Sequence, residues 1–348
     1  MLSITIDAST FAPPFSNPTA DSVYLFVERL LDWTDTLDRG NARILTSRST
    51  SEVLIRCELY PLRPHIRRLL AQTGVVEYDA NTIAAVVETL LNRSTTLEDA
   101  FLVTDVLASQ LSFSPDTFST YSPALLREEC QKCALLIAIL RTHADDPSLD
   151  NHAIAVRARR GDHVIRVTAI LDILEHTRTD LGSLPLPPTS FEGSIVVCDS
   201  FSDYLQTVEE TSLWQTATGN QDLDLAIRIA LLKDRRHRGV GADWNGLPRF
   251  AIGGLFFASV ASCGSLSGSG LAQRTLRAVV ETIEHLNLAA THHLRTGAGG
   301  GNPQRMRDAD GAWRRDIDYE YHLHYWECSG GFVELASIVV HNDFTIPE

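Results

Sequence analysis

A short stretch near the middle of the chain, Leu181–Thr189 with the sequence LGSLPLPPT, constrains the fold more than any other feature. It contains three prolines and has no hydrophobic period. Proline fixes the backbone φ angle and has no N–H to donate, so this stretch suits neither the interior of a helix nor a central strand. We therefore expect a linker over residues 181–192, which separates a domain of residues 1–180 from a domain of residues 193–348.

The hydrophobic pattern differs on the two sides of this stretch. Upstream, Leu2–Ile6 and Ala42–Thr46 are typical of short strands. Leu97–Leu107 and Ala124–Arg141 have helical spacing, as do other upstream segments. Downstream, Phe250–Ser262 is predicted as a buried strand or strand pair, and the chain finishes in a hairpin. We expect a mixed α/β protein, in which a helix-rich α/β region is followed by a smaller α+β domain ending in an antiparallel β-hairpin.

Charge and cysteine content limit the functional classes. The net charge of −14 opposes a general affinity for duplex nucleic acid, although an acidic body can carry a local basic groove. The six cysteines are scattered, and the Cys130/Cys133 pair lies in a predicted helix, so we interpret it as packing. The N-terminus lacks a secretory signal, and the longest apolar stretch, Phe250–Ala261, is shorter than the ~20 residues that span a membrane. These features predict a cytoplasmic protein with no membrane partner.

A glycine- and arginine-rich loop precedes the hairpin, with the sequence THHLRTGAGGGNPQRMRDADGAWRRDID. Its glycines would let backbone amides approach a ligand closely, and arginine binds phosphate or carboxylate oxygens in a bidentate way. The loop is therefore a candidate anion site, or else a surface excursion whose arginines pair with Asp308, Asp310 and Asp316. Its candidate residues are His292, His293, Arg295, Arg305, Arg307, Arg314 and Arg315.

The hairpin after this loop places several histidines close together. Alternate side chains of a strand share a face, so Glu320, His322, His324 and Trp326 point the same way. If the turn has two central residues, His341 on the second strand joins that face. A three-residue turn would put His341 on the opposite face. The convergence of the histidines therefore depends on the length of the turn.

This cluster allows three interpretations. Histidines beside arginines suit metal-free phosphodiester cleavage, with one histidine as base, another as acid and an arginine on the phosphorane charge. Alternatively, His322, His324 and a carboxylate could hold a divalent metal. The third interpretation is a sheet face whose histidines only pack and hydrogen-bond. The catalytic candidates are His322, His324, His341, Arg295 and Arg315, and the substrate-binding candidates are His292, His293, Arg305, Arg307 and Arg314.

A second anion candidate is the segment Gly264–Gly270, which lies between the predicted strand at Phe250–Ser262 and the next helix. A helix N-terminus presents free N–H groups and a positive dipole, so Gly268 and Gly270 are further substrate-binding candidates. The segment matches neither the phosphate-loop motif nor the dinucleotide-binding motif. The alternative is a flexible loop that caps the helix.

About the first 55 residues resemble the start of PIN-domain nucleases. Asp7 follows the first predicted strand, and Glu52 opens a helix after the second. The resemblance implies that these two acids help to bind Mg²⁺ or Mn²⁺ for RNA cleavage. The later acids of that family have no clear counterparts here, and Asp79 and Asp199 are the candidates. Asp7 and Glu52 also fit structural roles at a loop start and a helix start.

These features favour a nucleic-acid-cleaving hydrolase, such as an RNase of a bacterial toxin or of an anti-phage defence system, acting on RNA or single-stranded nucleic acid. The alternative is a non-enzymatic subunit of a multi-protein bacterial complex, in which hairpin aromatics contact a protein partner. Those aromatics are Tyr319, Tyr321, Tyr325 and Trp326. A third hypothesis is an enzyme that acts on a nucleotide or another small anion through Gly264–Gly270.

Overall fold

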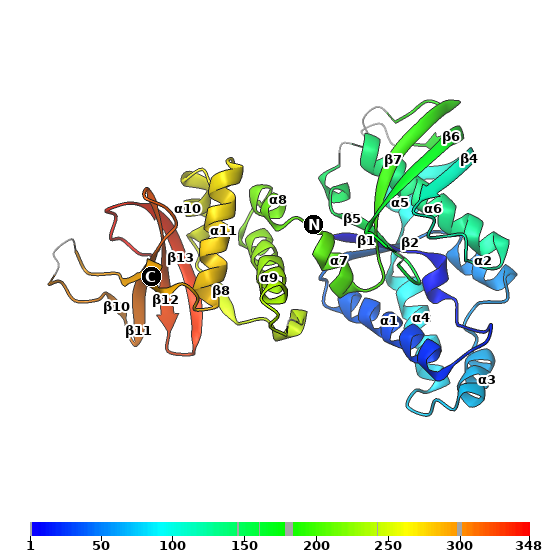
Figure 1. Cartoon of the computed structure of the whole chain (residues 1–348), viewed down its shortest axis with the longest axis horizontal. Coiled ribbons are helices and arrows are strands. Elements are labelled where there is room, and N and C mark those ends of the chain that lie inside the picture. Colours follow the sequence, from blue (N-terminus) through cyan, green and yellow to red (C-terminus); the bar gives the residue numbers. More distant parts are fainter. Residues whose placement is uncertain (1, 145, 160, 178–183, 242, 298–300) are drawn as a thin grey trace. The chain divides into compact units, whose positions relative to one another are not determined.

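The structure, a computed structural model, describes residues 2–144, 146–159, 161–177, 184–241, 243–297 and 301–348. The chain forms two compact units, Met1–Thr207 and Val208–Glu348, each with helices and a mixed sheet (Figure 1). The expected mixed α/β class is confirmed.

The first unit is built on a seven-stranded sheet in the order β3-β2-β1-β5-β7-β6-β4. The strands from β3 to β7 in this order run parallel, and β6 and β4 extend the sheet in an antiparallel manner. Every residue of β1 and β5 is buried, as expected for parallel strands that are covered on both faces. The strands are β1 (Ser3–Ile6), β2 (Arg43–Thr46), β3 (Thr95–Thr96), β4 (Val103–Ser114), β5 (His152–Ala155), β6 (Val164–His176) and β7 (Thr189–Cys198).

Among the helices of the first unit, α6 matches the segment expected at Ala124–Arg141. α1 begins at a reciprocal cap in which the side chains of Thr19 and Ser22 each accept the other residue's backbone N–H. Cys130 and Cys133 are buried in α6. The helices are α1 (Ala20–Asp38), α2 (Thr50–Arg56), α3 (Arg63–Thr73), α4 (Ala80–Arg93), α5 (Leu97–Phe101), α6 (Ala124–His143) and α7 (Phe201–Thr207), with 3-10 turns η1 (Ala8–Phe11) and η2 (Pro147–Leu149).

The predicted helix at Leu97–Leu107 is wrong beyond its first turns. α5 ends at Phe101 because Leu102 adopts a left-handed φ of 52°. The chain then continues as β4, whose long antiparallel pairing with β6 supplies the backbone hydrogen bonds of this segment. Tertiary pairing has overridden the local helical pattern.

The boundary between the units lies later than the predicted linker at residues 181–192. β7 begins at Thr189 and pairs with β6 and β5, so residues 189–192 belong to the first sheet. Residues 178–183 lie outside the described part of the chain. The prolines come immediately before β7, where their missing N–H groups disturb no strand ladder. The division between the units falls instead at Thr207/Val208.

The second unit contains a six-stranded sheet in the order β10-β11-β12-β13-β8, with β9 also paired to β11. Helices α10 and α11 contact β13, and α11 also contacts β11 and β12. The elements are α8 (Glu210–Gln215), α9 (Asn220–His237), β8 (Phe250–Ile252), α10 (Phe256–Ser262), α11 (Ser269–Ile283), β9 (Thr291–His293), β10 (Met306–Arg307), β11 (Asp310–Asp316), β12 (Tyr321–Cys328) and β13 (Phe332–Val340), with 3-10 turns η3 (Trp244–Gly246) and η4 (Leu288–Ala290).

The predicted strand at Phe250–Ser262 is wrong after Ile252. Gly253 crosses so close to β13 that a Cβ there would lie 3.0 Å from the backbone oxygen of Leu335. The chain turns at this glycine and its neighbour Gly254 and forms helix α10. The segment Gly264–Gly270 therefore follows a helix, not the strand that the anion-loop prediction assumed.

The hairpin turn has three residues, Ser329–Gly331, between the paired residues Cys328 and Phe332. Gly331 adopts a left-handed φ of 75°, which glycine tolerates without steric cost. By itself, this turn would place His341 on the face opposite the histidines of β12.

A β-bulge reverses that effect. The register shifts between His324 and Tyr325, so Ala336 has no partner in β12. Each residue of β13 after the bulge changes face relative to an ideal ladder. His341 therefore lies on the same face as His322, although through a bulge and not through a two-residue turn.

Candidate functional site

Three side chains at one end of the second sheet form a polar chain. Asp316, at the end of β11, is paired across the ladder with His322 on β12, and His341 directly follows β13. His322 Nδ1 lies 2.9 Å from Asp316 Oδ1, and His322 Nε2 lies 2.8 Å from His341 Nδ1. The His322 N–H does not point straight at the carboxylate oxygen, so the first contact is a close ion-pair contact, not an aligned hydrogen bond.

These contacts favour one pair of tautomers for the two histidines. An ionised Asp316 only accepts, so His322 presents Nδ1–H to it and keeps a lone pair on Nε2. His341 then donates Nδ1–H to His322, which leaves the lone pair of His341 on its own Nε2. Burial lowers the pKa of His322 below its ordinary value, although Asp316 acts in the opposite direction. The arrangement favours the tautomer of His341 that carries its lone pair on Nε2.

A hollow of about 570 Å³ lies beside this polar chain. His341 is exposed at its edge, and His292 also lines it. His292 Nε2 lies 3.7 Å from Asp316 Oδ2, so the same carboxylate contacts His292 directly and is linked to His341 through His322. The lining residues are Thr291, His292, His293, Arg295, Gly297, Trp313, Arg314, His341, Asn342 and Phe344.

Arg314 gives this hollow positive charge. Its Nε is buried without a hydrogen-bond partner, and within the described ranges no carboxylate forms an ion pair with its guanidinium. Arg295 lines the hollow as well, and the rings of His293 and Trp313 meet edge-on with centroids 4.2 Å apart. Guanidinium groups bind phosphate oxygens, and aromatic rings stack on bases. The lining therefore suits a phosphate that carries a base.

Sequence reasoning missed the role of Asp316, which it considered only as a partner for nearby arginines. It also missed Trp313, Asn342 and Phe344 in the lining. Asp316 could have been found by reading residues 310–316 as a third strand antiparallel to the hairpin, because its pairing would then place Asp316 beside His322.

His324 does not reach the hollow. Its side chain is fully buried, and Nδ1 donates a hydrogen bond of 2.8 Å to the backbone oxygen of Thr345. The C-terminal residues cover this part of the sheet, where Trp326 Nε1 also donates to Pro347 O. Burial lowers the pKa of His324 to about 4. The prediction that His324 is catalytic is therefore wrong, because its ring is closed off beneath the C-terminal segment.

We expect His324 to make the second unit sensitive to acid. The pKa of His324 is about 4 in the folded chain and 6.5 when unperturbed, so the unfolded chain binds a proton more readily between these two values. The free energy of unfolding therefore has its full value above pH 6.5 and decreases as the pH falls towards 4. A shift of this size corresponds to about 3 kcal/mol. In His324→Asn, the amide can keep the bond to Thr345 but does not titrate. Urea unfolding at pH 7 and pH 4.5 should show a smaller pH dependence for the variant, and an unchanged dependence would refute this account.

Arg315 has a structural position, not the predicted catalytic one. Its side chain is almost fully buried and lies 3.0 Å from Glu281 Oε2. It also donates to the backbone oxygens of Leu286, at 2.5 Å, and Asn287, at 3.2 Å. Adjacent strand residues point to opposite faces, so Arg314 reaches the hollow while Arg315 points to α11 and the residues after it.

Two other arginines do not reach the hollow. Arg307 lies 3.1 Å from Asp310 and 2.7 Å from Glu334, and its guanidinium stacks 4.7 Å from the Trp326 ring centroid. Arg305 is half-buried, its Nε has no hydrogen-bond partner, and it is absent from the lining. The alternative that arginines of this loop pair with nearby carboxylates is therefore confirmed for Arg307.

The hairpin does not present the aromatic partner surface that the interaction-subunit hypothesis assumed. Trp326 is fully buried, and Tyr325 is only 6% exposed. Tyr319 is exposed, and Tyr321 is half-buried. Trp326 contributes to the core of the second unit instead.

Gly268 and Gly270 lie at the start of α11 and do not line the hollow. A Cβ on Gly268 would meet its nearest neighbour, the oxygen of Gly264, at 3.9 Å, which is an ordinary contact. A Cβ on Gly270 would lie 3.4 Å from a terminal nitrogen of Arg274. Neither position requires glycine for close packing, and anion binding here stays a prediction.

The two acids that suggested a metal site lie in different environments. Asp7 is buried, and its Oδ1 accepts hydrogen bonds from Ser9 Oγ at 2.7 Å and Thr10 N at 3.1 Å. Burial raises its pKa to about 6. Glu52 is exposed and lies 3.6 Å from Arg56. The contacts of Asp7 and Glu52 fit their structural roles, and the implied metal site stays a prediction.

The later candidate acids also have local partners. Asp79 caps α4 by accepting from the N–H groups of Asn81 and Thr82, and Asp199 lies 3.5 Å from Arg29. Across the residues that the structure describes, no group of three or more His, Cys, Asp or Glu side chains is arranged to hold a metal ion.

Comparisons of the chain with protein-family models, curated proteins and solved structures found no match. No described helix combines the length and apolar character that crossing a membrane requires.

Proposed function

We propose that the second unit cleaves RNA by acid–base catalysis, with His341 and His292 as the two catalytic residues. The observation that carries this proposal is the polar chain from Asp316 through His322 to His341, which ends at a hollow that Arg314 makes positive. Two imidazoles and a guanidinium are groups that suit metal-free transesterification of a phosphodiester.

In this proposal, His341 Nε2 takes the proton of a ribose 2′-hydroxyl, and the 2′-oxygen attacks the neighbouring phosphorus. Protonated His292 gives its proton to the leaving 5′-oxygen as the P–O5′ bond breaks. Arg314 stabilises the charge on the phosphorane oxygens. Asp316 stabilises the positive charge that develops on the paired imidazoles. The products are a 2′,3′-cyclic phosphate and a 5′-hydroxyl.

The proposed substrate is RNA because its ribose supplies the nucleophile, the 2′-hydroxyl. The lining of the hollow supplies the acidic, basic and cationic groups. Trp313 and Phe344 line the same hollow and could stack on unpaired bases, which favours a single strand. The net charge of −14 also disfavours a general duplex-binding surface.

We further propose that such an enzyme serves as a bacterial toxin or an anti-phage defence protein in the cytoplasm. All six cysteines lie in the described part of the chain and carry free thiols, which suits a reducing compartment.

The first test is the cleavage of an RNA oligonucleotide and of its DNA counterpart by the purified full chain in the presence of EDTA. We expect cleavage of the RNA and none of the DNA, because deoxyribose lacks the 2′-hydroxyl. Equal cleavage of both strands, or cleavage that EDTA abolishes, would contradict the proposal.

A further inference from the structure

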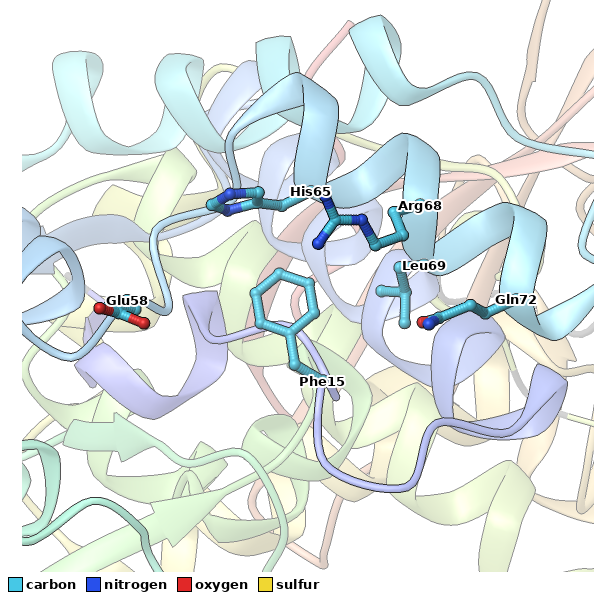
Figure 2. Close-up of a pocket in the computed structure, with 6 residues that line it drawn as sticks. All are labelled: Phe15, Glu58, His65, Arg68, Leu69 and Gln72. Carbon is cyan, nitrogen blue, oxygen red and sulfur yellow. The ribbon is translucent and has the colours of Figure 1, made fainter.

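A second hollow, of about 300 Å³, lies in the first unit and takes no part in the proposed cleavage. Phe15 comes from the connection that follows β1 and η1, and Glu58 from the connection after α2. The rest of the lining, His65, Arg68, Leu69 and Gln72, comes from α3 (Figure 2). The hollow is therefore formed by two connections and one helix face of the first unit.

The lining combines an aromatic ring with two cationic or titratable groups. His65 and Arg68 are three residues apart on α3 and therefore share a face of the helix. Figure 2 shows the Arg68 guanidinium beside the His65 ring, with Phe15 opposite both. The rings of Phe15 and His65 are nearly perpendicular, with centroids 6.1 Å apart. The N–H of Phe15 donates to Pro13 O at 2.8 Å, which holds the aromatic residue in a tight turn.

The local charge is opposite to that of the whole chain. Arg63, Arg67 and Arg68 of α3 are exposed, and none forms an ion pair with a described residue. The N-cap residue Leu62 provides no side-chain hydrogen bond, so the positive end of the helix lacks an internal side-chain partner. Of these three, only Arg68 lines the hollow, and its guanidinium without an ion-pair partner among the described residues indicates a site for an anion there, whereas Arg63 and Arg67 lie outside the lining.

Polar acceptors lie at both ends of the same hollow. Glu58 has a left-handed backbone with φ of 57°, a conformation that is costly for a residue other than glycine. Its carboxylate lies at the hollow (Figure 2). Gln72 lies at the other end. A simple inorganic anion would gain nothing from Phe15 or Glu58, whereas a nucleoside offers a ring to stack and hydroxyl or amino groups to donate.

We infer that this hollow binds a nucleoside 5′-phosphate, with the phosphate between His65 and Arg68 and the base against Phe15. Glu58 accepts hydrogen bonds from the ribose or the base. The ligand is either a free nucleotide or the phosphorylated 5′ end of an RNA strand. This inference stands independently of the proposed cleavage, whose residues all lie in the second unit.

Calorimetric titration of the full chain with AMP, adenosine and inorganic phosphate tests the inference. We expect AMP to bind at least about tenfold more tightly than inorganic phosphate, because base stacking adds to the phosphate contact. Arg68→Gln should weaken AMP binding about tenfold. Phe15→Ala should weaken the binding of AMP but not that of inorganic phosphate.

Arg67→Gln is the matched control, since it removes the same charge from the neighbouring position of α3 without altering the lining. It should change AMP affinity by less than about twofold. Equal losses in both arginine variants, equal affinities for AMP and phosphate, or no AMP binding at millimolar concentration would overturn the inference. A 2′-O-methyl tetranucleotide with a 5′-phosphate that binds more tightly than 2′-O-methyl AMP identifies the RNA end as the ligand, and weaker binding identifies the free nucleotide.

Discussion

Replacing His341 with asparagine is expected to lower the rate of RNA cleavage by about 10²–10⁴-fold, the usual contribution of a general base. The asparagine amide can still donate to His322 Nε2, so the polar chain stays intact while the basic nitrogen is lost. The loss should appear in kcat more than in KM, because the proton transfer occurs only in the transition state. Single-turnover cleavage of an RNA oligonucleotide measures it.

His293→Asn is the matched control, since His293 lines the same hollow and packs against Trp313, whereas the hydrogen bond to His322 comes from His341. We expect its cleavage rate to stay within a few-fold of the parent. If the two variants lose activity equally, the hollow binds RNA without His341 acting as a base. If neither loses activity, the assigned site is wrong.

Replacing Arg315 with methionine should destabilise the second unit by about 3–5 kcal/mol, which is the usual cost of removing one partner of a buried ion pair. Glu281 would lose its buried partner, and the backbone oxygens of Leu286 and Asn287 would lose a donor. Urea unfolding followed by circular dichroism measures the change in the free energy of unfolding.

Arg314→Met provides the comparison, because the two arginines are neighbours on β11 and point to opposite faces. We expect it to leave the free energy of unfolding nearly unchanged and to lower RNA cleavage. The reverse pattern, with Arg315→Met folded and inactive and Arg314→Met active, would restore the original assignment of Arg315 as catalytic.

Much of the fold follows from local sequence patterns. The spacing of apolar residues gives α1 and α6, and the alternation at both ends of the chain gives β1 and the hairpin. β4 could not be predicted in this way, because the left-handed residue Leu102 ends a helical pattern that the sequence continues. The break after Ile252 depends on the close approach of Gly253 to β13, a tertiary contact with no local signal.

The site shows the same limits. Strand alternation alone separates Arg314 from Arg315, and a prediction that used it would have kept only Arg314 at the hollow. The sequence left the face of His341 conditional on the length of the turn, and its observed position depends on the bulge at Ala336, which compensates for a three-residue turn. The burial of His324 depends on the C-terminal segment, whose hydrogen bonds through backbone oxygens such as that of Thr345 leave no pattern in the sequence.

The chemistry at the cut ends provides the most direct test of the account. The substrate is a DNA oligonucleotide that contains one ribonucleotide, incubated with the full chain in EDTA, and mass spectrometry identifies the ends. Because imidazoles activate the ribose hydroxyl, we predict one cut, 3′ to the ribonucleotide, with a 2′,3′-cyclic phosphate on one fragment and a 5′-hydroxyl on the other. Ends bearing a 3′-hydroxyl and a 5′-phosphate, or an uncut strand, would contradict it.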